Sequence, residues 1–247
     1  SAKDDAAGLA IADRMNTQVR GMNVAVRNAG DAISMAQVAE GGLSTMNDML
    51  QRMRELAVQA SNATNSAGSA GDIAKLDNEY KQLGAELSRM LDATQFNGEK
   101  ILNTTASYVF QVGANAGAEN QITIANGDIS LSGNAAFSAV ASGGASATLI
   151  TGTASANTAN IAALDAAISA VNDRRASLGA LQSRFENTIS YLRTASENQS
   201  AARGRIMDAD FAAETANLSR TQILQQAGTA MIAQANQAPQ QVLALLR

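Results

Sequence analysis

Apolar residues recur along the first part of the chain in steps that alternate between four and three positions. This spacing places them on one side of an α-helix and is typical of helices that pack lengthwise against each other. The stripe breaks at Glu40, Gly41 and Gly42, where we predict a stutter or kink. Its members are Met15, Val19, Met22, Val26, Ala29, Ile33, Ala36, Leu43, Met46, Leu50, Met53 and Ala57.

Two further stripes with the same spacing predict two more helices. Asp72 precedes the first of them and is expected to cap that helix, which should end before the turn dipeptide Asn97-Gly98. The members of this stripe are Leu76, Tyr80, Leu83, Leu87 and Met90. The other stripe consists of Leu164, Ile168, Val171, Leu178, Leu181, Phe185, Ile189 and Leu192.

The middle of the chain has a different pattern. Residues 108–112 and 121–124 are short runs of strand-forming residues, and beyond Leu131 the chain is rich in Ala, Ser, Gly and Thr. We therefore predict a mainly α fold, an elongated helical bundle or coiled-coil-like rod with a small β region inserted in the middle. The expected parts are residues 1–102 (helical), 103–160 (β and loop), 161–207 (helical) and 208–247 (a separate helix).

A fourth stripe runs along the last segment, from Leu224 to Leu245, with Pro239 inside it. We expect this proline to kink or end the helix locally. The other predicted helices can pack against one another. The fourth stripe is therefore left without a packing partner inside the chain. An apolar helix face without an internal partner usually packs against another molecule.

The composition narrows the chemistry. The chain has 247 residues, a net charge of −4, one proline, and neither cysteine nor histidine. These absences exclude disulfides, thiolate or imidazole zinc sites and Ser-His or Cys-His nucleophiles. We expect no catalytic residue, no metal and no cofactor, and the acidic balance argues against nucleic-acid binding. No stretch is long and apolar enough to predict membrane insertion.

Several motifs resemble bacterial flagellins. The run 1–12 (SAKDDAAGLAIA), the run 50–59 (LQRMRELAVQ) and the run 94–98 (TQFNG) are similar to the N-terminal part of that family. The run 110–117 (FQVGANAG) resembles its first strands. The runs 205–214 (RIMDADFAAE) and 222–228 (QILQQAG) resemble its C-terminal signature.

The resemblance implies a structural subunit of the flagellar filament, secreted to the cell exterior, that assembles with other copies of itself. It also implies contacts with a flagellar export chaperone, at the C-terminal helix, and with the filament cap. Ser1 falls inside the family pattern, so we expect an N-terminally truncated chain. The C-terminal helix would supply the assembly contacts, through Leu224, Ala227, Met231, Ala235, Val242 and Leu245.

The resemblance implies a second partner, the flagellin-sensing Toll-like receptor of animals. Carrying the family's recognition patch over through the motifs at 50–59 and 94–98 places its centre at Arg52, Leu56 and Glu79. Arg52 and Leu56 are four residues apart and are expected to share a helix face. The complete set of expected receptor contacts is Gln51, Arg52, Arg54, Glu55, Leu56 and Glu79.

An alternative function is that of a cell-surface adhesin or carbohydrate-binding homologue acting through the β region. Carbohydrate sites usually present aromatic platforms with clustered polar groups. The central zone offers only Tyr108, Phe110 and Phe137 for this purpose, which gives the alternative little support.

Overall fold

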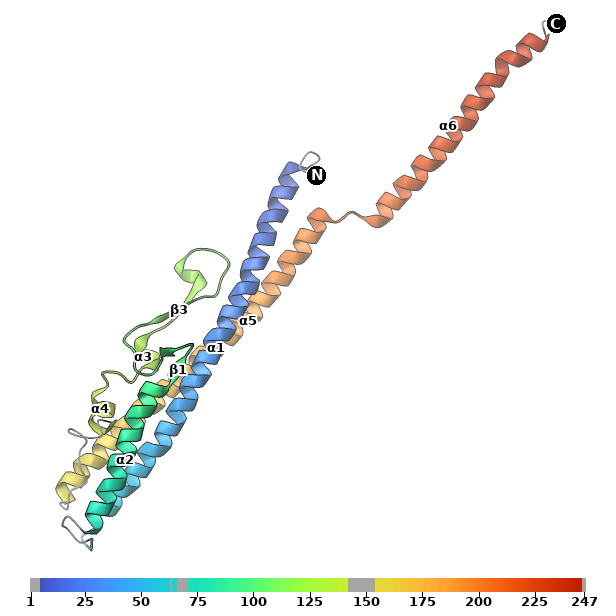
Figure 1. Cartoon of the computed structure of the whole chain (residues 1–247). Helices are drawn as coiled ribbons and strands as arrows, with labels where there is room; N and C mark the ends of the chain where they lie inside the picture. The colour runs from blue at the N-terminus through green and yellow to red at the C-terminus, as the bar shows by residue number, and fades with distance from the viewer. Residues whose placement is uncertain (1–4, 63, 66–70, 142–153, 246–247) are drawn as a thin grey trace. The chain divides into compact units, whose positions relative to one another are not determined.

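The computed structural model describes residues 5–62, 64–65, 71–141 and 154–245, with side chains described except at 154–156 and 236–245 (Figure 1). The chain forms two compact units. One unit is Asn16–Gln199, and the other combines Ser1–Met15 with Ser200–Arg247. The fold is mainly α, as predicted, with long helices and a small strand region in the middle of the chain.

The first stripe forms α1 (Ala6–Ala60), a helix of 55 residues that is about 80 Å long at 1.5 Å per residue. The helix runs through Glu40–Gly42 without interruption, and the stutter or kink expected there stays a prediction. Gly42 allows Thr94 and Leu102 to pack close to the backbone of α1. A Cβ atom added to it would lie 2.9 Å from Oγ1 of Thr94 and 3.2 Å from Cδ1 of Leu102.

In the unit Asn16–Gln199, α5 (Ala154–Met207) runs antiparallel to α1 (Figure 1). Gln182 donates a hydrogen bond of 3.0 Å to Glu40, and Gln199 donates one to Gln18. The later residue of α1 pairs with the earlier residue of α5, which is the order expected for two antiparallel helices. The helix α2 (Asp72–Ala93) lies along the C-terminal part of α1 in the same antiparallel sense.

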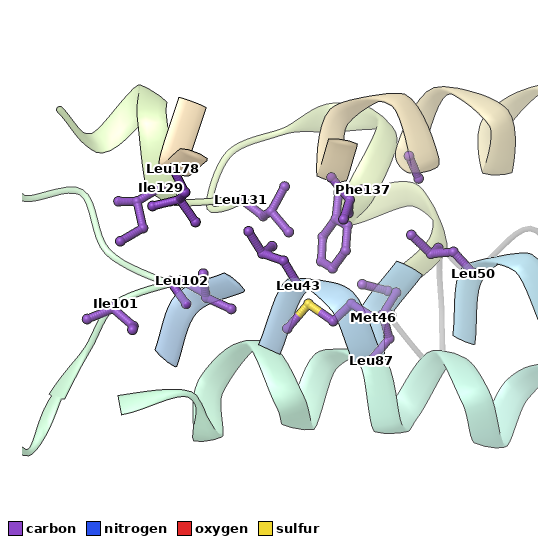
Figure 2. Packing of buried hydrophobic residues seen from close by; sticks show 14 of the residues in the cluster. Leu43, Met46, Leu50, Leu87, Ile101, Leu102, Ile129, Leu131, Phe137 and Leu178 are labelled. Carbon is purple, nitrogen blue, oxygen red and sulfur yellow. The ribbon is translucent and has the colours of Figure 1, made fainter. Parts of the chain in front are cut away.

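The buried face of α1 changes character along its length. Up to Ala39 it consists mainly of alanine, with Ala25, Ala29, Ala32, Ala36 and Ala39 at most 1% exposed. From Leu43 onward it consists of larger residues, and Leu43, Met46, Leu50, Met53 and Leu56 are fully buried. Small side chains allow two helix axes to approach closely, whereas large ones fill the wider space where α2 joins. Figure 2 shows Leu43, Met46 and Leu50 packing among residues that include Leu87, Phe137 and Leu178.

The strands form two small antiparallel sheets. Tyr108–Gln111 (β3) pairs with Gln121–Ile124 (β4), which confirms the strands expected from those runs. The other sheet, Gln95–Phe96 (β1) with Glu99–Lys100 (β2), lies in a part of the chain that we had assigned to helix. Asn97 and Gly98 join these strands with φ values of 52° and 84°. Two consecutive positive φ values match the right-handed twist of a hairpin, so the turn dipeptide sets up a hairpin after α2.

Residues 126–141, predicted as β region and loop, contain two short helices instead, α3 (Asn126–Ile129) and α4 (Ala135–Ala141). The alanines that made this stretch look like a loop are strong helix formers. Asn134 precedes α4 and caps its start, because its Oδ1 accepts a hydrogen bond of 3.0 Å from the backbone N–H of Phe137. The buried Phe137 and Val140 then attach α4 to the core.

Aspartate side chains cap the starts of α1 and α6, but the cap that we expected from Asp72 at the start of α2 is not formed. Asp5 Oδ1 accepts a hydrogen bond of 2.8 Å from the N–H of Gly8 at the start of α1. Asp210 Oδ1 accepts hydrogen bonds from Ala212 and Ala213 at the start of α6 (Phe211–Leu245). Asp72, in contrast, is the first residue of α2, and Gly71 holds the cap position. Pro239 does not end α6, which continues to Leu245.

Candidate interaction surfaces

A cluster of charged side chains lies where α1 and α2 run side by side. The cluster, here called the charged surface, consists of Arg52 and Glu55 on α1 and Glu79 on α2. Nε of Arg52 donates a hydrogen bond of 2.9 Å to Oε1 of Glu79, and Nη1 donates one of 3.0 Å to Oε2 of Glu55. The structure thus brings together residues that are 27 positions apart in the sequence.

The electrostatics of the charged surface follow from these contacts. Hydrogen bonds to Glu55 and then to Glu79 raise the pKa of the Arg52 guanidinium above its ordinary value. Arg54 points to α5, where its Nε lies 2.6 Å from Oδ1 of Asp165, and this hydrogen bond raises the pKa of Arg54. Both arginines are about half exposed, so their charged groups remain accessible from solvent.

Leu56, four residues after Arg52 on the same helix, does not reach this surface. Its side chain is fully buried in the main core. The reason is that α1 packs against both α2 and α5 in this region, so its buried arc is wider than the seam of a two-helix coiled coil. A residue three positions after the buried Met53 falls inside that wider arc.

Sequence reasoning missed two partners near the charged surface. Asp165 could not be assigned to Arg54 because the two residues are 111 positions apart. On α2, Glu86 and Arg89 form an ion pair with an N–O distance of 2.6 Å. The spacing of three residues would have predicted this contact on a helix. The hydrogen bond from Arg89 lowers the pKa of Glu86.

The helix α6 carries the residues that we expected to serve assembly. Leu224, Ala227, Met231 and Ala235 have exposed side chains, whereas those of Val242 and Leu245 lie outside the described residues. The two largest, Leu224 and Met231, are 64% and 67% exposed. Other large apolar residues of α6 are exposed as well, namely Phe211, Leu218, Ile223 and Ile232.

The three aromatic residues considered for carbohydrate binding are engaged in other contacts. Phe137 is buried, and Phe110 meets the ring of Phe185 edge-on with centroids 5.9 Å apart. The hydroxyl of Tyr108 donates a hydrogen bond of 2.9 Å to the backbone carbonyl of Lys100. These residues stabilise the β region rather than forming an open platform.

Among the described residues, no helix combines the length and the apolar character that crossing a membrane requires. The same residues contain no cluster of three or more Asp or Glu side chains placed to hold a metal ion.

Comparison with known proteins identifies the class of the chain. Residues 1–107 match the family model of the bacterial flagellin N-terminal helical region, and residues 161–246 match that of the C-terminal helical region. Since the two models together cover most of the sequence, the chain belongs to the bacterial flagellins. It is a structural protein of the flagellar filament and not an enzyme.

Particular relatives agree with this assignment. The chain is 48% identical over 247 residues to a flagellin of Halalkalibacterium halodurans, covering all of this chain and 86% of the relative. It is 43% identical to the flagellar filament 33 kDa core protein of Treponema phagedenis, covering all of this chain and 87% of the relative. A crystal structure of Bacillus cereus flagellin aligns with a TM-score of 0.53 and 27% identity, covering 72% of this chain and 94% of that one.

Proposed function

We propose that this flagellin assembles with other copies of itself through the apolar face of α6. The exposed apolar side chains on that helix support the proposal. Two large apolar residues of that face, Leu224 and Met231, are seven positions apart and are 64% and 67% exposed. Phe211, Leu218, Ile223 and Ile232 are exposed as well, at other positions around the helix. Burying one such side chain contributes about 1.5–3 kcal/mol, so several together provide a strong drive for association. Val242 and Leu245 would extend the same face.

Charge placed on this face should block assembly. We expect Leu224→Asp combined with Met231→Asp to abolish elongation of filament seeds, measured by electron microscopy and light scattering. Gln226→Asp is the matched control, because Gln226 is exposed on the opposite side of the same helix. Filaments of normal length from the double variant would overturn the proposal.

The same face would be covered before export by a chaperone of the flagellar secretion system, which delivers the subunit to the cell exterior beneath the filament cap. An exposed apolar helix is an aggregation hazard in free solution, which supports a covering partner. Copurification with that chaperone should be lost in the double variant and kept in the control. Equal copurification of all three proteins would place the chaperone elsewhere on the chain.

We further propose that the charged surface is recognised by the flagellin-sensing Toll-like receptor of animals. The direct contacts would be Gln51, Arg52, Arg54, Glu55 and Glu79. The hydrogen bonds that join Arg52 to Glu55 and Glu79 support this, because they hold several charged groups in one fixed arrangement. The buried Leu56 would act indirectly, by fixing the position of α1.

A receptor-activation assay in reporter cells tests this second proposal. Arg52→Ala and Glu79→Ala should each reduce potency by about tenfold, consistent with loss of a charged hydrogen bond at an interface. Arg27→Ala is the control, since Arg27 is an exposed residue of the same helix about 37 Å away. Undiminished potency of both test variants would refute the proposal. Loss with Glu86→Ala but not with Glu79→Ala would move the contact two turns along α2.

A further inference from the structure

An open cleft lies in the unit Asn16–Gln199, between the turn that joins β3 to β4 and the side of α5. Its volume is about 930 Å³, within the range of small-molecule sites. The floor is apolar, formed in part by Met22, Val112 and Leu192, each of which is at most 7% exposed. Among the described residues of this unit, those of the charged surface do not line the cleft.

The α5 wall of the cleft carries an aromatic ring between polar groups. Arg184, Asn187 and Tyr191 are spaced by three and four residues and therefore lie along one side of the helix. Tyr191 is 71% exposed. In the described part of the chain, neither its hydroxyl nor the side chains of Arg184 and Asn187 have a hydrogen-bond partner.

The opposite wall is the turn 113–120, and Gln111 holds it in shape. Its Nε2 donates hydrogen bonds to the carbonyls of Gly113 and Asn115, at 3.0 and 2.9 Å. Its own backbone carbonyl accepts a hydrogen bond of 2.9 Å from Asn28 of α1. The turn is thus built on the helix in a defined conformation, with Asn115 and Asn120 facing the cleft.

The polar lining is dominated by side-chain amides. Six of the lining residues are of this kind: Gln18, Asn115, Asn120, Gln121, Asn187 and Gln199. An amide offers donors and an acceptor together, which matches a sugar hydroxyl that both donates and accepts. The charged lining residues are one arginine, Arg184, and one glutamate, Glu119, so the cleft carries no excess charge.

We propose that this cleft binds a neutral oligosaccharide, with one sugar ring stacked on Tyr191. An exposed phenol ring presents a flat apolar face and a polar edge, which suits the apolar C–H face of a sugar ring. Arg184 and Asn187 donate to hydroxyls of that ring from the α5 side, and Asn115 contacts the next ring from the turn. The balanced charge selects neutral over acidic sugars.

The lining argues against a protein partner in the same cleft. Tight protein interfaces centre on large apolar or aromatic anchors that are fully desolvated in a pocket. Here the apolar floor is buried, and the exposed lining is mainly polar, with one aromatic ring, that of Tyr191. Nucleic acid is disfavoured as well, because one arginine balanced by one glutamate provides no track for a phosphate backbone.

Tyrosine fluorescence gives a direct test on the intact protein. The chain has three tyrosines and no tryptophan. Tyr80 is fully buried and the hydroxyl of Tyr108 is bound to Lys100, so a ligand in the cleft should change mainly the emission of Tyr191. The probes are the tetramer of N-acetylglucosamine and maltotetraose. Chemical shift changes of the Asn and Gln side-chain amides provide a second readout.

We expect at least one probe to bind, and Tyr191→Ala to weaken that binding about tenfold. Tyr191→Phe keeps the ring and should stay within about threefold of the unaltered protein, since only one hydrogen bond is lost. Arg193→Ala, an exposed residue of α5 outside the cleft, is the control.

Two results would overturn the inference. One is that neither probe binds at concentrations up to about 10 mM, since a Kd above that value corresponds to a binding free energy weaker than about −3 kcal/mol. The other is a change in self-association of Tyr191→Ala without sugar binding, which would make the cleft a contact between copies. The α6 variants above should leave the sugar titration unchanged, so this inference and the assembly proposal fail independently.

Discussion

The adjacent glycines of α1 provide a matched pair, because they have opposite surroundings. Gly41 is exposed, and a Cβ atom added there meets nothing within 4 Å. A Cβ atom added to Gly42 would lie 2.9 Å from Oγ1 and 3.1 Å from Cγ2 of Thr94. Thr94 cannot turn away freely, because its hydroxyl donates a hydrogen bond of 2.8 Å to the carbonyl of Met90.

Alanine at the two positions should therefore change stability in opposite directions. Gly41→Ala gains helix propensity and is expected to stabilise the protein by about 0.5–1 kcal/mol. Gly42→Ala gains the same amount but overpacks its contact, at a cost of about 1–3 kcal/mol, so its net effect is destabilising. The difference between the two variants should be about 2 kcal/mol.

Urea unfolding followed by circular dichroism measures both variants at one temperature. A second substitution, Thr94→Ala, removes the two nearest of the three atoms that the methyl group added by Gly42→Ala would meet, the third being Cδ1 of Leu102. It should restore most of the stability that this variant loses. Such recovery appears as a coupling energy in the double-mutant cycle. If Gly42→Ala stabilises the protein as much as Gly41→Ala does, the close contact of α1 with Thr94 is not present in solution.

Three further predictions concern buried and titrating groups of the same unit. Within the described ranges the buried hydroxyl of Tyr80 has no hydrogen-bond partner, so Tyr80→Phe should stabilise the protein by about 1 kcal/mol in urea unfolding at neutral pH. Burial, and secondarily Asp77, raises the pKa of Tyr80 to about 12, so the native protein should lose stability above the ordinary tyrosine pKa of 10.0, and Tyr80→Phe should lose less. The hydrogen bonds from Lys100 and then Asn103 lower the pKa of Asp92 below its ordinary value of 3.8. This carboxylate therefore stabilises the fold at neutral pH, and its contribution is lost on acidification. The melting temperatures of Asp92→Asn and of the unaltered protein should accordingly converge as the pH is lowered. Phe185→Ala removes a fully buried ring in contact with Phe110 and should cost about 3–5 kcal/mol in the same unfolding assay, whereas a loss below about 1 kcal/mol would contradict the packing.

The helices could be predicted because their apolar spacing is regular over many turns. Met22, Leu43, Met53, Leu164 and Phe185 are all buried as their stripes required. The width of the buried arc could not be predicted, since it depends on how many helices meet at one place. Leu56 illustrates this, because its burial depends on α2 and α5 packing together on α1.

The short elements could not be predicted with the same success. In α4, alanine and serine give no periodic signal, and the helix depends on the cap from Asn134 and on the buried Phe137. The cleft beside Tyr191 was missed for a similar reason. Its walls come from parts of the chain about 70 residues apart. Nothing in the local sequence around Tyr191 marks it as exposed beside a turn.

The change from alanine to large residues along the buried face of α1 implies unequal cohesion within the unit Asn16–Gln199. An alanine seam removes little apolar area from water per turn, whereas the segment from Leu43 to Ala57 removes much more. Opening should therefore begin at the alanine end and stop where α2 joins. Amide hydrogen exchange should show fast exchange around Ala25 and Leu192 and slow exchange around Leu50. Local unfolding of this unit should therefore proceed turn by turn from its alanine-lined end, while the end at which α2 packs stays folded.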